Sequence, residues 1–78
     1  MPHVIVKMYA GRAETQKRTL ADEITRAVSK SLGYGNDAVS VSIEDVAPKD
    51  WVEKVYKPEI VDKPGQLYKK SSYFPAQK

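Results

Sequence analysis

The 78-residue sequence contains no cysteine, and it has a single histidine and a single tryptophan. Without cysteine, the chain can form neither a disulfide framework nor a thiolate metal site, so neither can reinforce a small core. The lone histidine, His3, cannot hold a metal by itself, and we expect no metal and no cofactor. No stretch approaches the roughly 20 apolar residues of a membrane span. The composition therefore predicts a cytoplasmic protein with no membrane partner.

The basic charge is confined to the end of the chain. Residues 1–65 balance ten Lys and Arg against ten Asp and Glu, and the net charge of +3 comes from Lys69, Lys70 and Lys78. A nucleic-acid-binding domain usually clusters its basic residues on one face or along one helix. A basic tail on a neutral body makes nucleic acid an unlikely partner.

Hydrophobic periodicity predicts an α/β (α+β) fold of β-α-β type in a single domain, residues 1–78. Alternating apolar residues indicate two strands, and apolar residues at three-and-four spacing indicate a helix between them. Strands joined by such a crossover should be parallel. The predicted elements are a strand over 2–9, a helix over 13–32, a strand over 39–46, a short helix over 49–62 disturbed by Pro58, and a basic C-terminal arm over 66–78.

The size of the chain predicts self-association. A domain this short buries only about 60% of the surface that its unfolded chain exposes. A sheet of two strands with one helix is not independently stable, because three or more strands are normally needed. We therefore expect a homo-oligomer in which subunits extend each other's sheet.

The opening stretch "MPHVIVKMYAGR" contains a candidate for chemistry. If Met1 is removed, the ring nitrogen of Pro2 becomes a free secondary amine at the start of a strand. Apolar surroundings and a nearby cation disfavour the charged form of an amine, which would leave it able to act as a base. A proline is also well tolerated as the first residue of a strand, and Met1-Pro2 alone favours that structural role.

The first 33 residues resemble the 4-oxalocrotonate tautomerase family of the tautomerase superfamily. The matching features are Pro2, Gly11-Arg12, Gln16-Lys17 and the helix that ends in Ser31-Leu32. The chain length and the stretches "DWVEKVYKPEI" and "KKSSY" are more similar to the dimeric phenylenolpyruvate-tautomerase-like branch. The resemblance implies an enol-keto tautomerase (an isomerase) for a small enol or 2-oxo acid, and a homodimer rather than a hexamer.

The resemblance also implies roles for three residues. Pro2 would be the general acid/base, Arg12 would bind the substrate carboxylate, and Trp51 would form part of an apolar wall that lowers the pKa of the proline. A guanidinium can hold a carboxylate through two parallel hydrogen bonds. Each residue also has a structural alternative, a solvated loop arginine for Arg12 and a core anchor of the second helix for Trp51.

Two further positions bear on the substrate and the reaction. Ser40 stands where the hexameric enzymes carry a second arginine, so the resemblance favours a monocarboxylate substrate. Ser40 can still donate a hydrogen bond to a substrate, or it is a plain solvent-facing strand residue.

Glu53 in "WVE" resembles the water-activating glutamate of haloacrylate dehalogenases, although Tyr9 replaces the second arginine that those enzymes use. A hydratase or dehalogenase, and a non-catalytic binding module acting through residues 66–78, are therefore alternatives.

Overall fold

The computed structural model describes residues 1–73, and residues 74–78 lie outside the described part. The chain divides into two compact units, one from Met1 to Asp45 and one that begins at Val46. No helix among the described residues is both long enough and apolar enough to cross a membrane.

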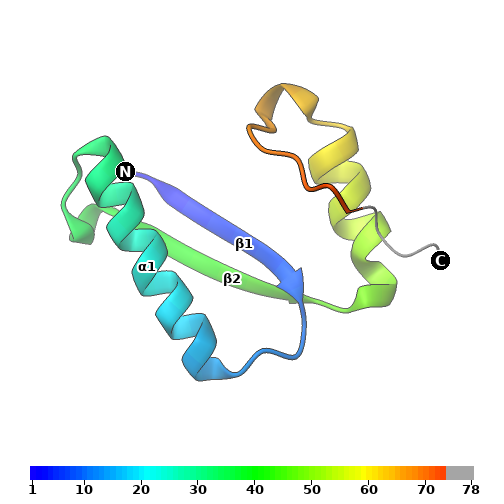
Figure 1. Ribbon diagram of the computed structural model, residues 1–78, viewed down its shortest axis with the longest axis horizontal. Coiled ribbons are helices and arrows are strands. Elements are labelled where there is room, and N and C mark those ends of the chain that lie inside the picture. Colours follow the sequence, from blue (N-terminus) through cyan, green and yellow to red (C-terminus); the bar gives the residue numbers. More distant parts are fainter. Residues whose placement is uncertain (74–78) are drawn as a thin grey trace. The chain divides into compact units, whose positions relative to one another are not determined.

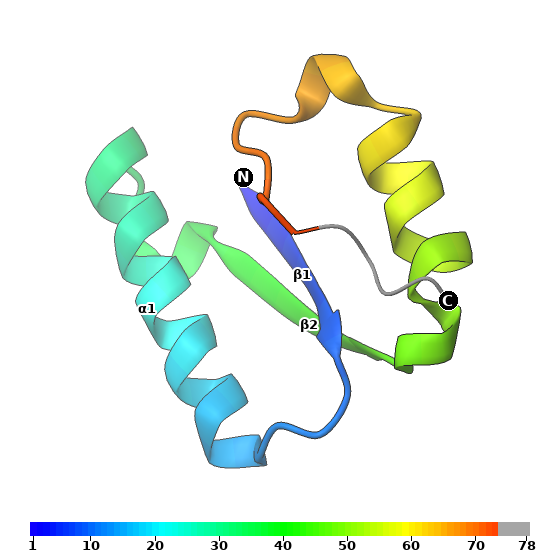
Figure 2. The ribbon, with the colours of Figure 1, turned by 45° about the vertical axis from the view of Figure 1, so that its right-hand side comes forward.

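The first unit is a β-α-β arrangement, as predicted. Strand β1 (His3–Tyr9) leads into helix α1 (Glu14–Leu32), and a short 3₁₀ turn, η1 (Asn36–Ala38), leads into strand β2 (Ser40–Val46), whose last residue, Val46, already belongs to the second unit. The strands are parallel neighbours in a two-stranded sheet, and α1 lies across one face of that sheet (Figures 1 and 2). The α/β class and the β-α-β order that the sequence predicts are confirmed.

The alternating pattern of the strands explains how the sheet uses its two faces. Val4 and Val6 of β1 and Val41 and Ile43 of β2 are half-buried, whereas Ile5 between the first two is 55% exposed. Since successive side chains of a strand point to opposite faces, the half-buried set shares one face and Ile5 lies on the other. One face of the sheet therefore remains open.

Helix α1 carries a matching stripe of half-buried residues. Lys17, Leu20, Ile24 and Val28 recur at three-and-four spacing along it and are all half-buried. The helix ends at Gly33, whose φ of 79° and ψ of 18° are left-handed and whose N–H donates to the carbonyl of Ser29. A glycine in this conformation is a common helix stop because it has no Cβ to clash.

The second unit is helical but irregular. A 3₁₀ turn, η2 (Pro48–Asp50), precedes a π-helix, η3 (Val52–Val61), and a further 3₁₀ turn, η4 (Pro64–Gln66), follows. The short helix expected over 49–62 is thus present with a wider winding, and its last N–H, that of Asp62, donates to the carbonyl of Lys57 at 3.0 Å. Pro58 lies inside this helix and has no N–H to donate, and a prolyl ring collides with the carbonyl four residues earlier in an ordinary α-helix.

Complete burial is rare in the described part of the chain. Val46 and Val55, with 4% and 5% of their surface exposed, are its only fully buried hydrophobic residues, and both belong to the second unit. Gln66, the first residue of the predicted arm, ends η4, whereas residues 67–73 form neither helix nor strand, and Tyr68 is 99% exposed. The last five residues of that arm, 74–78, lie outside the described residues.

Candidate active site

Pro2 lies at the end of the sheet, immediately before β1. Its carbonyl oxygen accepts a hydrogen bond of 3.1 Å from the backbone N–H of Ser40, the first residue of β2. Pro2 itself is half-buried, whereas Met1 before it is 95% exposed. The pairing with β2 therefore fixes the position of Pro2, while the residue that would have to be removed to free its nitrogen is accessible.

The side chains of His3 and Ser40 meet beside Pro2. The imidazole Nδ1 of His3 lies 2.6 Å from the hydroxyl Oγ of Ser40, which is hydrogen-bonding distance. Both residues are exposed and lie on the face of the sheet that α1 does not cover. The sequence alone led us to consider His3 only as a lone metal ligand, although the alternation of the two strands also indicates that His3 and Ser40 lie on one face of the sheet.

Arg12 lies at the other end of β1, in the exposed connection to α1. Gly11 before it has a φ of 122°, a value that residues with a side chain rarely adopt. A Cβ placed at Gly11 would meet nothing within 4 Å, so the backbone angle alone accounts for glycine there. Gly11 thus sets the direction in which the chain presents Arg12.

The Gln16-Lys17 pair organises the start of α1. The side-chain oxygen of Gln16 accepts a hydrogen bond of 3.2 Å from the backbone N–H of Ala13 just before the helix. The ammonium of Lys17 forms an ion pair of 2.5 Å with the carboxylate of Asp45 in β2. These contacts hold the connection that carries Arg12 against the second strand, and they give both motif residues a structural role.

The structure keeps Pro2 and Arg12 apart within one chain. Pro2 precedes the seven-residue strand β1, and Arg12 comes three residues after its end (Figure 1). A strand rises by about 3.3 Å per residue, so the two residues are separated by roughly 20 Å or more. A small organic acid cannot contact both of them in a single copy of the chain.

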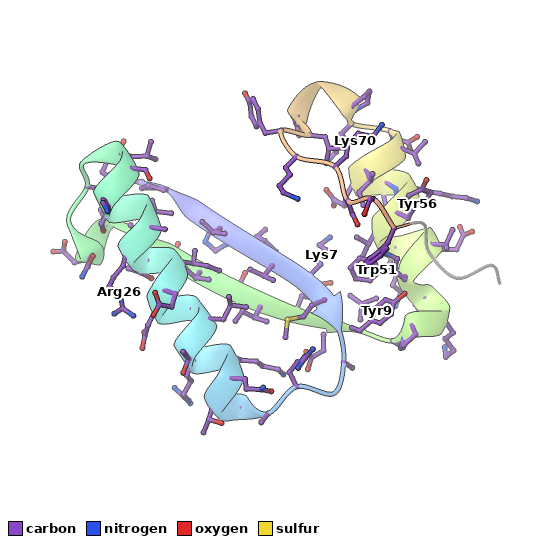
Figure 3. All side chains as sticks on the ribbon, viewed as in Figure 1. Lys7, Tyr9, Arg26, Trp51, Tyr56 and Lys70 are labelled. Atoms are coloured by element: carbon purple, nitrogen blue, oxygen red, sulfur yellow. The ribbon has the colours of Figure 1, made fainter. Side chains whose placement is uncertain are left out.

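Trp51 and Glu53 belong to the second unit. Trp51 is half-buried and directly precedes η3, at the start of the helical segment (Figure 3). The carboxylate of Glu53 accepts a hydrogen bond of 3.0 Å from the ammonium of Lys57 one turn further on, and both side chains are mostly exposed. Glu53 therefore lies in an ion pair on the helix surface. Within residues 1–73, no group of three or more His, Asp or Glu residues could hold a metal ion.

Comparison with known proteins agrees with the β-α-β fold. The family model described as "Tautomerase enzyme" matches residues 2–55. A probable tautomerase of Xylella fastidiosa is 41% identical over 94% of this chain and 89% of its own length, and Tautomerase PptA of Cronobacter sakazakii is 34% identical over 94% and 97%. The crystal structure of TomN, titled a 4-oxalocrotonate tautomerase homologue in the tomaymycin biosynthetic pathway, superposes with a TM-score of 0.63 at 25% identity, over 82% of this chain and 95% of TomN.

The β-α-β fold, and relatives named tautomerases that match 94% of the chain, define a small enzyme of the isomerase class. This chain belongs to the tautomerase family. The family and the enzyme class that the sequence predicts are thereby confirmed.

Proposed function

We propose that this protein interconverts the enol and keto forms of a small monocarboxylic 2-oxo acid, with Pro2 as the general acid/base. The observation that carries the proposal is the position of Pro2, which is held by β2 at the start of β1 behind an exposed Met1. The names of the relatives, all tautomerases, support the reaction type.

The chemistry requires a group that takes a proton from one atom and returns it to another. Removal of Met1 converts the amide nitrogen of Pro2 into a secondary amine, and the half-buried setting of Pro2 disfavours the charged form of that amine. A lowered pKa brings an amine closer to the operating pH, where a general acid/base works best. The prolyl ring and the hydrogen bond from Ser40 limit the motion of this nitrogen, which pre-positions the base.

Arg12 would bind the substrate carboxylate from a neighbouring copy of the chain. The guanidinium can form two charge-assisted hydrogen bonds with a carboxylate and draw electron density toward a developing enolate. Because one copy separates Arg12 from Pro2 by the length of β1, the complete site takes Pro2 from one subunit and Arg12 from another. We accordingly propose a homo-oligomer, with a homodimer favoured, and place Trp51 in the apolar wall of the site.

A monocarboxylate fits the polar groups next to Pro2. Ser40 offers a hydroxyl and His3 an imidazole, and neither supplies the permanent charge that a second carboxylate would need. An aryl- or alkyl-enolpyruvate has one carboxylate for Arg12 and an uncharged remainder. We therefore favour such an acid over an enol dicarboxylate.

The two alternatives have less support in the described part of the chain. Hydration through Glu53 would need a carboxylate that is available to a water molecule in the site, and the Glu53 carboxylate is paired with Lys57 on an exposed helix surface. Binding through the basic arm would rest on Lys69, Lys70 and exposed Tyr68, which is a small footprint for a nucleic acid.

Intact mass and one ultraviolet assay test the proposal. The purified protein should lack the mass of Met1 and should accelerate the ketonisation of phenylenolpyruvate. Pro2→Ala should lower kcat/KM by about 100-fold or more, since a positioned acid/base contributes roughly 10²–10⁴-fold. The circular dichroism spectrum should be unchanged. A trimmed, folded wild-type protein that is inactive on enol acids would overturn the proposal.

A further inference from the structure

The hydrogen-bonded pair of His3 and Ser40 is the polar feature nearest to Pro2. His3 follows Pro2 directly, and Ser40 donates its backbone N–H to the Pro2 carbonyl at 3.1 Å. The two side chains come from different strands and meet at 2.6 Å on the open face of the sheet. Both residues are exposed, so their remaining hydrogen-bonding positions can reach a ligand.

We propose that His3 and Ser40 together bind the oxygen on C2 of the substrate, the oxygen that changes from hydroxyl to carbonyl during ketonisation. This inference rests on the proposed tautomerase function. It gives His3 a substrate-binding role, and it makes the Ser40 hydroxyl part of a two-residue unit.

The chemistry of the pair suits an oxygen that loses its proton during the reaction. The single proton of the enol hydroxyl passes to Pro2, so another group must donate a hydrogen bond to the C2 oxygen as it becomes a carbonyl. A neutral imidazole can donate through Nδ1, and a serine hydroxyl can accept one hydrogen bond while it donates another. When Nδ1 of His3 carries the proton and donates to Ser40, the serine hydroxyl donates to the C2 oxygen.

The location of the pair selects this oxygen over the carboxylate. A substrate carboxylate calls for a cation, and Arg12 supplies one from another copy in the proposed site. The proton that Pro2 transfers leaves the C2 oxygen and arrives on the adjacent carbon, so this oxygen must lie close to the Pro2 nitrogen. His3, the first residue of β1, follows Pro2 directly in the chain. Ser40, the first residue of β2, is paired with Pro2 across the sheet.

Steady-state kinetics with phenylenolpyruvate test the pair. Ser40→Ala and His3→Leu should each lower kcat/KM by about tenfold, the value of one neutral hydrogen bond. The double variant should lose no more kcat/KM than the less active of the two single variants, because the effects of residues that act as one unit do not add. Ser42→Ala is the matched control, since Ser42 is exposed two residues further along the same face of β2, and it should retain the wild-type kcat/KM.

Two further measurements separate binding of the C2 oxygen from a general disturbance of the site. His3→Asn, which keeps a donor and acceptor near the position of Nδ1, should recover a substantial part of the loss seen in His3→Leu. The inhibition constant of cinnamate, which lacks an oxygen on C2, should stay within about twofold of wild type in every variant, because no hydrogen bond to that oxygen is lost.

The outcomes are distinguishable. Unchanged kcat/KM in both single variants, fully additive losses, or an equal weakening of cinnamate would overturn the role of the pair while leaving an active wild-type enzyme. An inactive wild-type protein with Met1 removed would overturn the tautomerase proposal and this inference together.

Discussion

The two ends of strand β1 differ in what holds them and in what they expose. At the first end, Pro2 is half-buried and paired with Ser40 of β2, and the His3 side chain is hydrogen-bonded. At the last end, Gly11 turns the chain at a φ of 122° and Arg12 stands exposed. One strand thus has Pro2, held by backbone pairing, before its first residue and Arg12, an exposed cation, after its last residue.

Two unlike ends of one strand would allow a small chain to divide a reaction between copies of itself. The end that would handle a proton is fixed by backbone pairing, as acid/base chemistry requires. The end that would capture an anion projects into solvent, where it can enter the site of a neighbour. The first unit also lacks a fully buried side chain and leaves Ile5 on an open face, so association would complete both the core and the site.

Mixing two inactive variants tests whether the two ends of β1 act in different subunits, and it should give the largest effect. Pro2→Ala and Arg12→Ala should each lose about 100-fold or more in kcat/KM, since one removes the acid/base and the other a doubly hydrogen-bonded charge. Co-expressed in equal amounts with different tags, they should recover about a quarter of wild-type activity in a homodimer, because half of the dimers are mixed and each has one intact site.

The control for this mixing experiment is the pair of singly expressed variants combined only in the assay cuvette, without subunit exchange. They should show no recovery. Absence of recovery in the purified mixed oligomer would show that Pro2 and Arg12 act from the same chain, and the composite site would have to be abandoned.

A positive charge introduced beside the first end of β1 should change which substrates the site prefers. Ser40→Arg should place a guanidinium beside Pro2 and raise kcat/KM for an enol dicarboxylate such as 2-hydroxymuconate by about tenfold, the gain expected of a charged hydrogen bond. The same change should lower kcat/KM for phenylenolpyruvate. Ser42→Arg adds the same charge two residues away and serves as the control. Equal effects of both variants would mean that only the overall charge matters.

Much of this arrangement could be predicted from the sequence because short-range physics dictates it. The alternation of Val4 with Ile5 and the spacing of Leu20, Ile24 and Val28 define a strand and a helix locally, and a β-α-β connection of this length leaves few topologies. The helix ends at Leu32, the predicted limit, because Gly33 after it adopts a left-handed conformation. Pro2 and Arg12 could be singled out because their types and positions matched a known pattern.

What the sequence did not reveal depends on contacts between distant positions or on fine backbone geometry. The His3–Ser40 bond joins residues 37 positions apart, and it depends on the strand register. The π winding of η3 depends on how the chain accommodates Pro58, and periodicity alone indicates only a helix. Likewise, the sequence identified Gln16 and Lys17 only as part of a motif. The structure shows that Gln16 accepts a hydrogen bond at the start of α1 and that Lys17 forms an ion pair with Asp45.

The two glycines with positive φ offer a matched test of the Arg12 end. Asparagine tolerates the left-handed region near a φ of 60°, so Gly33→Asn, at a φ of 79°, should cost only a few tenths of a kcal/mol. Gly11→Asn, at 122°, lies outside that region and should cost about 1–2 kcal/mol. Urea unfolding measures both, and Gly11→Asn should also raise KM by displacing Arg12. Equal costs would show that the φ of Gly11 adjusts freely.

The smallest effect is expected away from β1. Glu53→Gln removes a surface ion pair with Lys57, and exposed pairs one helical turn apart contribute only about 0.3–0.5 kcal/mol. Because the proposed proton transfer uses Pro2, kcat/KM for phenylenolpyruvate should stay within about twofold of wild type, the change expected from a surface residue. Lys57→Met breaks the same pair from its other side and should match Glu53→Gln in stability and activity. A large loss of phenylenolpyruvate ketonisation in Glu53→Gln alone would instead assign the Glu53 carboxylate a part in the tautomerisation itself.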